Sequence, residues 1–252
     1  VLTNQQIPGA DYCTWDEFEK WLNTLGEYQL DIETNVTPFW CDKRIVTIQF
    51  GDIQNTVQYV LEWAILTENQ KTFLKQSIED WEICKLAHNA AFEYIVLRFH
   101  GIELHNLYCT MVAEKVLNGG IEMENYALSD LTEKYLGFPL DKSLQLSFGD
   151  GILTLEKVEY AATDCKYLGE LRRRQLIAMS KWMNEQVKDP LETLRLEMKA
   201  LHVFSDFTYY GMGIDTEKWM ENEALASPIV EKAAEDLDQW VRQDSRLRDQ
   251  AI

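Results

Sequence analysis

A succession of short apolar segments in the first 110 residues limits the possible folds more than any other feature. Four of these segments predict strands: residues 28–32, 45–50, 56–60 and 83–87. Helical periodicity occurs around and between them, and two capping boxes mark helix starts. The helices are expected from Thr14, from Thr67 to about Ile78, and from Ala90 to Phe99. Strands that alternate with helices in this way predict an α/β fold.

From Met111 onward the pattern is mostly helical. Apolar residues recur at i, i+3 and i+4 in three segments: residues 111–117, 128–136 and 155–183. Asp189 is a good N-cap, Pro190 suits the first helical position, and Glu192 lies three residues after the cap. We therefore expect a boundary between a domain of residues 1–188 and a helical extension of residues 189–252. Two helices, about 190–209 and 216–243, are expected in the extension.

The chain is strongly acidic, with 42 Asp and Glu against 24 Lys and Arg among 252 residues and a net charge of −18. Apolar residues still make up 46% of the sequence, which suffices for a globular core. The acidity argues against a protein that holds nucleic acid by bulk positive charge. It does not exclude a site that is built from clustered carboxylates.

The cysteines and the apolar runs limit the cellular compartment that we expect for this protein. The five cysteines are widely spaced without a C-x-x-C pair, so neither a disulfide framework nor a zinc site is indicated. No apolar run approaches the roughly 20 residues of a membrane helix. The first ten residues lack the pattern of a signal peptide. We expect a cytoplasmic, monomeric protein with no membrane partner.

Asp31 and Glu33 form the first cluster with chemical potential, at the end of the first expected strand. Residues two apart on a strand point to the same side, so both carboxylates project together. Like charges this close favour a cation between them, and oxygen ligands suit Mg²⁺ or Mn²⁺. Taken alone, such a pair is more often an exposed acidic strand end.

Two further clusters follow along the chain. Glu93 lies in the first turn of the expected helix that begins after Asn89, where the helix dipole favours a carboxylate. Tyr160 and Asp164 lie four apart on one helical face. Each has an ordinary structural reading when taken singly. Nearby His88 is expected to pack or hydrogen-bond rather than to bind a metal.

An acidic pair on a strand, then Asn89-x-x-Phe92-Glu93, then Tyr160-x-x-x-Asp164, resembles the three motifs of the DEDD superfamily of 3′–5′ exonucleases. The tyrosine spacing is similar to that of its DEDDy branch. Segments between the motifs look like those of ribonuclease D-like chains, and the resemblance covers residues 25–178. It implies a ribonuclease H-like, or DnaQ-like, three-layer fold with a central mixed sheet flanked by helices, followed by a C-terminal helical extension.

The resemblance also implies a mechanism. Four acids would hold two divalent metal ions, Mg²⁺ or Mn²⁺, for two-metal hydrolysis of the terminal phosphodiester: Asp31, Glu33, Glu93 and Asp164. Tyr160 would orient the attacking water, since a phenol with a pKa of about 10 is a poor general base. Contacts with the terminal nucleotide are expected from Thr34, Asn89 and Phe92. Lys142 is a candidate contact to a phosphate, with an ordinary surface position as an equal alternative.

Two other features have open alternatives. Phe39 and Trp40 follow the first motif in a loop marked by Pro38, and they are candidates for stacking on terminal bases, with core packing as the alternative. The run of residues 172–174 is expected to form a solvated helix face, with contact to phosphates as the alternative.

Two segments near the C-terminus, residues 196–201 and 210–217, resemble the link from exonuclease into thumb in family A DNA polymerases. The Asn-Ala-Ala-Phe-Glu form of the second motif is most similar to bacteriophage members. The resemblance implies proofreading of single-stranded or frayed DNA 3′ ends during replication, in the host cytoplasm if the protein is viral. It also implies a polymerase domain in a longer chain or a separate replication partner.

Two alternative functions stay open. A free-standing RNA exonuclease of the ribonuclease D type would use the same active site. A catalytically silent scaffold or nucleic-acid-binding module is the second alternative, because Glu93 stands where the family usually has Asp. Glu keeps the charge but adds one methylene, and a metal site tolerates an error of only about 0.2 Å.

Overall fold

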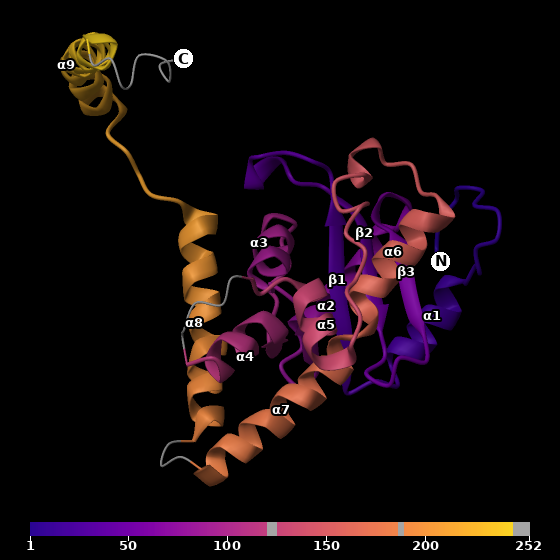
Figure 1. Cartoon of the computed structure of the whole chain (residues 1–252). Coiled ribbons are helices and arrows are strands. Elements are labelled where there is room, and N and C mark those ends of the chain that lie inside the picture. Colours follow the sequence, from indigo (N-terminus) through magenta and orange to yellow (C-terminus); the bar gives the residue numbers. More distant parts are fainter. Residues whose placement is uncertain (120–124, 186–188, 244–252) are drawn as a thin grey trace. The chain divides into compact units, whose positions relative to one another are not determined.

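A computed structural model describes residues 1–119, 125–185 and 189–243. The chain forms a mixed five-stranded sheet in the order β3-β2-β1-β4-β5. The strands are β1 (Glu27–Thr34), β2 (Ile45–Gly51), β3 (Gln58–Glu62), β4 (Cys84–Ala87) and β5 (Leu107–Cys109). β1 pairs antiparallel with β2 and parallel with β4, so β1 lies at the centre of the sheet (Figure 1).

The four strands expected from the sequence are present, with ends that differ by up to two residues from the expected ones. β3 begins two residues later than expected, because Thr56 is drawn into a turn in which its backbone N–H donates to the Asp52 carboxylate at 3.0 Å. β5 was not expected, since three residues are too short to show alternation. It pairs parallel with β4 and extends the sheet on that side.

Nine α-helices lie in the described part of the chain. They are α1 (Trp15–Leu22), α2 (Glu68–Glu79), α3 (Ala91–Phe99), α4 (Thr110–Leu117), α5 (Leu128–Leu136), α6 (Leu155–Lys166), α7 (Leu168–Glu185), α8 (Pro190–Tyr210) and α9 (Thr216–Gln243). Three 3₁₀ turns accompany them: Trp40–Asp42, Trp63–Ile65 and Phe148–Asp150. Both expected capping boxes are formed, with Thr14 and Thr67 as N-caps.

The single helix expected over residues 155–183 is wrong, because Tyr167 separates α6 from α7. The reason lies at Gly169, at the start of α7, whose backbone approaches the β2–β3 turn. A Cβ at this position would meet the carbonyl oxygen of Ile53 at 2.4 Å. The Gly169 N–H also donates to Gln29 Oε1 on β1 at 2.7 Å. This junction fixes the end of α6 against the central strand.

The two faces of β1 have different surroundings. Tyr28, Leu30 and Ile32 point into a core that α1 and α2 cover, where Tyr28 lies 5.3 Å from Phe50 between ring centroids. The alternate residues of β1 point to the other face. Helix α6 crosses that face and packs on β1, β2 and β3 (Figure 1). The result is a three-layer arrangement in which the odd-numbered residues of β1 face α6.

Helix α8 belongs to the first compact unit, which runs from Val1 to Tyr210. It packs against α3 and α4, and Leu194 and Leu201 are buried there. The compact unit therefore extends beyond the boundary expected after residue 188. The second unit, residues 211–252, contains α9, which has no buried residue in its described range. No helix in the described ranges combines the length and the apolar character that a membrane span requires.

Candidate active site

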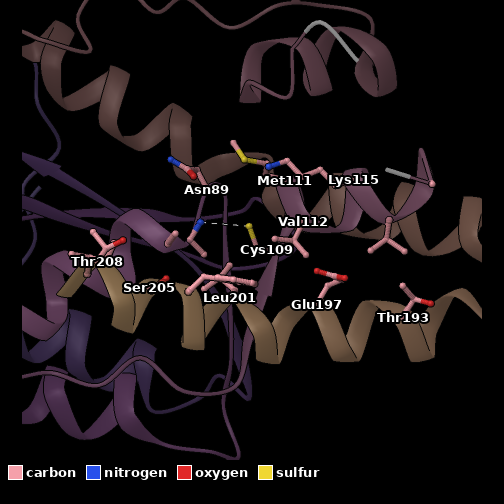
Figure 2. Close-up of a pocket in the computed structure, with 16 residues that line it drawn as sticks. Asn89, Cys109, Met111, Val112, Lys115, Thr193, Glu197, Leu201, Ser205 and Thr208 are labelled. Carbon is pink, nitrogen blue, oxygen red and sulfur yellow. Dashed lines mark hydrogen bonds between the residues drawn. The ribbon is translucent and has the colours of Figure 1, made fainter. Parts of the chain in front are cut away.

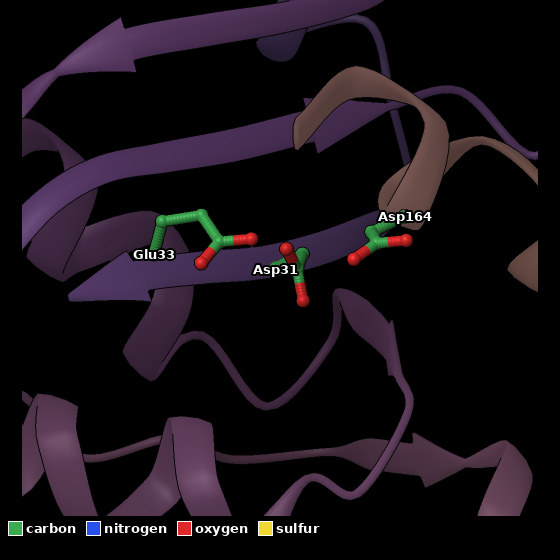
Figure 3. A group of neighbouring side chains, drawn as sticks. All are labelled: Asp31, Glu33 and Asp164. Atoms are coloured by element: carbon green, nitrogen blue, oxygen red, sulfur yellow. The ribbon is translucent and has the colours of Figure 1, made fainter. Parts of the chain in front are cut away.

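Three carboxylates meet where α6 crosses β1. Asp31 and Glu33 project from the same face of β1, and Asp164 projects from α6 (Figure 3). One oxygen from each of the three lies within 4.8 Å of the others. The strand period brings the first two together, and the packing of α6 on the sheet adds the third. The structure thus gathers residues that are up to 133 positions apart in the sequence (164 − 31).

The neighbouring strand β2 places two polar side chains beside this cluster. Asp31 pairs with Gln49 and Glu33 with Thr47 across the β1–β2 ladder. Gln49 and Thr47 are fully buried, and Gln49 Nε2 donates to Thr47 Oγ1 at 2.6 Å. Directly opposite residues point to the same face, so these two polar side chains lie beside the acidic pair. The sequence does not reveal them as site residues, because the alternating pattern of β2 does not show which strand it pairs with.

Enclosure by the protein changes the protonation of the acidic pair. Burial, followed by the charge of Asp164, raises the pKa of Asp31 to about 7. Burial, followed by the charge of Asp31, raises the pKa of Glu33 to about 9. When a divalent cation binds, its charge favours the ionised form, so carboxyl groups with such pKa values lose their protons to the solvent.

Lys142 supplies a positive charge inside the cluster. Its Nζ donates to both oxygens of Asp164, at 2.8 Å and 2.9 Å. Burial raises the pKa of Asp164, while the lysine charge opposes that rise. Lys142 is therefore placed at the carboxylates, where its ammonium group partly offsets their negative charge.

Glu93 lies beside the three-carboxylate cluster but is not among its members. It is only 2% exposed, in the first turn of α3. Its Oε2 atom has no hydrogen-bond partner in the described part of the chain. Burial, followed by the charge of Asp31, holds its pKa well above the ordinary value. A buried oxygen without a hydrogen-bond partner is unusual, and it indicates that Glu93 binds a ligand that is not part of the protein chain.

The turn before α3 places Asn89 at the site. Asn89 adopts φ +54°, in the left-handed region that Asn tolerates better than most residues. Its carbonyl accepts a hydrogen bond from the Phe92 N–H at 2.8 Å. This tight turn lets the chain leave β4 and enter α3 with Asn89, Phe92 and Glu93 all near the cleft.

Tyr160 lies one turn before Asp164 on α6 and is 7% exposed. Burial, followed by the charge of Asp164, raises the pKa of its phenol further above its ordinary value. Lys142 Nζ lies 5.6 Å from the centroid of its ring. A phenol in this environment keeps its proton, so Tyr160 can donate a hydrogen bond to a nucleophile but cannot act as a base.

A cleft of about 430 Å³ opens above these groups. It is lined by the four acids and by four residues expected to contact the nucleic acid: Thr34, Asn89, Phe92 and Lys142. Phe39 and Trp40 do not line it. Phe39 is 63% exposed in its loop, whereas Trp40 packs on Phe92 with ring centroids 5.7 Å apart.

Lys43 lines the cleft and was missed from the sequence. Its Nζ lies 5.5 Å from the ring centroids of both Trp40 and Phe92 and donates to the Thr37 carbonyl at 3.1 Å. A signal was present, because a lysine three residues after Trp40 in an acidic chain shares the loop of the proposed stacking residues.

The sequence predicts structural roles for His88, for residues 172–174 and for the cysteines. His88 is half-buried, its Nδ1 lies 2.8 Å from Thr110 Oγ1, and desolvation lowers its pKa to about 4, so it packs and hydrogen-bonds as predicted. Arg172 pairs with Glu27 at 2.5 Å, while Arg173 and Arg174 pair with Glu170. All five cysteines are free.

The donor set fits a hard divalent cation. Asp31, Glu33 and Asp164 offer only oxygen atoms, at mutual distances that one ion can span. Glu93 adds a buried oxygen that lacks any hydrogen-bond partner in the described residues. Among the described residues, this group consists of carboxylates alone, and oxygen ligands of this kind suit a hard cation.

Comparison of folds finds several similar solved structures. The POL domain of Pol1 from M. smegmatis, in complex with DNA primer-template and dNTP, has a TM-score of 0.70 at 14% identity over 89% of this chain and 36% of that chain. Brucella melitensis NrnC has a TM-score of 0.61 at 19% identity over 74% and 87% of the two chains, and another of its structures has bound Mg²⁺. Escherichia coli RNase D has a TM-score of 0.59 at 20% identity over 77% and 51%.

At these identities the similarity concerns the fold, and it confirms the expected ribonuclease H-like α/β architecture. No curated protein matches in a comparison of sequences. A sequence profile described as 3′–5′ exonuclease does match, over residues 13–175. This range contains β1, α3 and α6, which carry the four acids, and it spans more than half of the chain. The protein therefore belongs to this family of 3′–5′ exonucleases and carries a 3′–5′ exonuclease domain.

Proposed function

We propose that the protein removes nucleotides from single-stranded or frayed DNA 3′ ends, as a proofreading exonuclease of the DEDDy type. The observation that carries the proposal is the convergence of Asp31, Glu33 and Asp164 in one cleft, with Glu93 and Tyr160 beside them. The order of these residues along the chain is that of the three exonuclease motifs.

Two Mg²⁺ or Mn²⁺ ions would be held by Asp31, Glu33, Glu93 and Asp164. When bound, such ions activate a water for attack and stabilise the leaving 3′ oxygen. Tyr160 then orients the attacking water through its phenolic hydrogen. Lys142, which already lies at the carboxylates, would contact the phosphate that is cleaved.

The terminal nucleotide would lie on the residues that line the cleft. Asn89 and Thr34 offer polar groups for the sugar and phosphate, and Phe92 offers a ring that Trp40 supports from behind. Lys43, at the rim of the same rings, adds a second positive charge for the backbone of the strand. Phe39 is exposed enough to stack on a base that has left its duplex.

A DNA substrate and a polymerase context are supported by the C-terminal part of the chain. The Pol1 structure covers more of the chain than the ribonuclease structures do, 89% against 77% for RNase D. We infer that residues 189–252 are the start of a family A, bacteriophage-type polymerase thumb and residues 1–188 the exonuclease domain. With a net charge of −18, the chain itself would bind DNA weakly, and a polymerase domain or replication partner would supply affinity.

RNA is the second candidate substrate. It is favoured by the fold match to RNase D, described as an exoribonuclease involved in structured RNA processing. The cleft residues named above do not distinguish the two sugars. Hydrolysis of matched single-stranded DNA and RNA of one sequence, with Mg²⁺, decides between them. A strong preference for RNA would exclude the proofreading function.

A metal titration tests whether the site is catalytic at all. We expect release of mononucleotides from the 3′ end of 5′-labelled single-stranded DNA with Mg²⁺ or Mn²⁺, and none with a chelator. Asp31→Asn should abolish this release, because it removes charge from the centre of the cluster. If the wild-type protein releases no nucleotide with either ion, the exonuclease-like fold serves as a silent scaffold.

A further inference from the structure

A second pocket adjoins the cleft and is larger, about 700 Å³. It lies between the start of α3, helix α4 and helix α8, within the first compact unit (Figure 2). Its walls are largely apolar, with Ile95 from α3, Val112 and Val116 from α4, and Leu201 from α8. The roles proposed above for the active-site residues leave this pocket without an occupant.

A buried hydroxyl in the wall indicates a ligand. Ser205 of α8 is 2% exposed, and its Oγ has no hydrogen-bond partner in the described part of the chain. Buried polar atoms are nearly always paired, since an unpaired one loses its hydration without compensation. Ser205 lines the pocket, and rotation of its side chain would turn the enclosed hydroxyl toward a molecule in the pocket, which would supply the missing partner (Figure 2).

An exposed aromatic ring completes the pocket. Phe204, next to Ser205 on α8, also lines it and is 67% exposed. Large apolar side chains on the surface are ordinary when single, but this ring stands at an apolar hollow. Phe204 and Ser205 together offer a stacking surface and a hydrogen-bonding group, the two elements by which proteins bind flat heteroaromatic rings.

The pocket and the cleft share two lining residues. Asn89 and Met111 line both of them, so a strand with its 3′ end at the carboxylates can reach the pocket directly. Of the described lining residues, Lys115 is the basic one and Glu197 the acidic one, and both are exposed. The pocket is therefore not a phosphate site, whereas its rim at Lys115 suits the backbone of a strand.

We propose that this pocket binds the base of a nucleotide upstream of the 3′-terminal one. The base stacks on Phe204, its edge hydrogen-bonds to the Ser205 hydroxyl, and Lys115 contacts the adjoining phosphate. The inference rests on the proposed function, since the strand must enter through the exonuclease cleft. This contact adds affinity for single-stranded DNA and none for a single nucleotide, which cannot reach the pocket.

The test compares substrates of increasing length. The shortest is the p-nitrophenyl ester of thymidine 5′-monophosphate, which fills the terminal site alone, and the others run from the dinucleotide to the hexanucleotide of single-stranded DNA. Phe204→Ala is compared with Phe207→Ala. Phe207 is also 67% exposed on α8, with its ring centroid 6.3 Å from that of Phe204, but it does not line the pocket.

For the wild-type protein, KM should fall at the length that first places a base in the pocket. Phe204→Ala should raise KM about tenfold at and above that length, the size of one base–aromatic stack. It should leave hydrolysis of the single-nucleotide ester unchanged, and Phe207→Ala should behave as wild type throughout. Ser205→Ala should raise KM for the same long substrates, with a magnitude that depends on the base in the pocket.

The outcomes separate this inference from the proposed function. If all substrates are hydrolysed and Phe204→Ala equals Phe207→Ala at every length, the pocket does not bind a base, while the exonuclease function stands. If the wild-type protein hydrolyses nothing, the proposed function fails. Fluorescence anisotropy of a labelled hexanucleotide then still tests the pocket, because loss of binding in Phe204→Ala alone would support it and equal binding would overturn it.

Discussion

The ammonium group of Lys142 lies 2.8 Å and 2.9 Å from the two carboxylate oxygens of Asp164. Asp164 is a proposed metal ligand, but in this arrangement both of its oxygens already accept hydrogen bonds from the Lys142 ammonium group. A metal ion that binds Asp164 must share these oxygens with the lysine or displace it. Since Lys142 projects from the loop after α5, a displaced side chain can turn to a phosphate in the cleft.

Lys142→Met should therefore tighten metal binding while weakening the use of substrate. Removal of a competing cation from a partly exposed ion pair is worth about 1 kcal/mol, so the Kd for Mn²⁺ should fall about fivefold in calorimetry. KM for single-stranded DNA should rise, because a phosphate contact is lost. Lys71→Met is the control, since it removes the same charge from α2, outside the cleft. An unchanged or weaker affinity for Mn²⁺ would show that Lys142 does not compete.

Glu93→Gln should make the metal-free protein more stable and the metal-loaded protein less active. At neutral pH the native protein must either bury the Glu93 charge or take up a proton, and the amide removes this requirement. The free energy of unfolding should rise by about 1 kcal/mol in the presence of a chelator. Metal-dependent hydrolysis should fall by about tenfold or more.

Glu93→Asp separates charge from reach at this position. It keeps the carboxylate, so the gain in stability of Glu93→Gln should be absent, while the shorter side chain moves its oxygens away from their present place. Urea unfolding and hydrolysis assays on both variants provide the comparison. Equal activity of Glu93→Gln and wild type would remove Glu93 from the metal site.

Local periodicity made much of the site predictable. Asp31 and Glu33 share a strand face because strands repeat every two residues, and Tyr160 and Asp164 share a helix face because they are four apart. That Asp31 and Glu33 meet Asp164 could be expected only from the resemblance to known motifs. The strand pattern alone left open which helix would cover β1.

The rest depended on tertiary contacts that leave little trace in the sequence. Gln49 and Thr47 come to the acidic pair through the β1–β2 register, and Lys43 through a loop whose path no periodicity describes. The break between α6 and α7 was hidden because apolar spacing continues across Tyr167. Gly169 was the signal for that break, since a close approach of two backbones requires a residue without a side chain.

Gly169→Ala should destabilise the protein by about 1–3 kcal/mol. The added Cβ would lie 2.4 Å from the Ile53 carbonyl oxygen, and backbone cannot yield as a flexible side chain does. Urea unfolding should show a lower midpoint with an unchanged slope. Gly26→Ala is the control, because nothing lies within 4 Å of a Cβ there, and it should stay within about 0.5 kcal/mol of wild type. Equal stability of the two variants would mean that the α7 start is not held against the β2–β3 turn.

Metal binding should release protons at neutral pH. Burial raises the pKa of Glu33 from 4.5 to about 9 and that of Asp31 to about 7, so the metal-free native state holds protons that the unfolded chain has lost. Between about pH 4.5 and 9 the native state thus binds more protons than the unfolded state, and the free energy of unfolding falls as pH rises. A bound divalent cation favours the ionised carboxylates and expels these protons.

Calorimetry of Mn²⁺ binding at pH 7 in two buffers of different ionisation enthalpy measures this release. We expect about one proton or more per protein for the wild type, and a smaller number for Glu33→Gln, which has no proton to lose at that position. In the presence of a chelator, Glu33→Gln should also lose part of the decrease in unfolding free energy between pH 5 and 9. A binding enthalpy that is the same in both buffers would contradict the raised pKa values, because it would show that the acids are already ionised before the metal arrives.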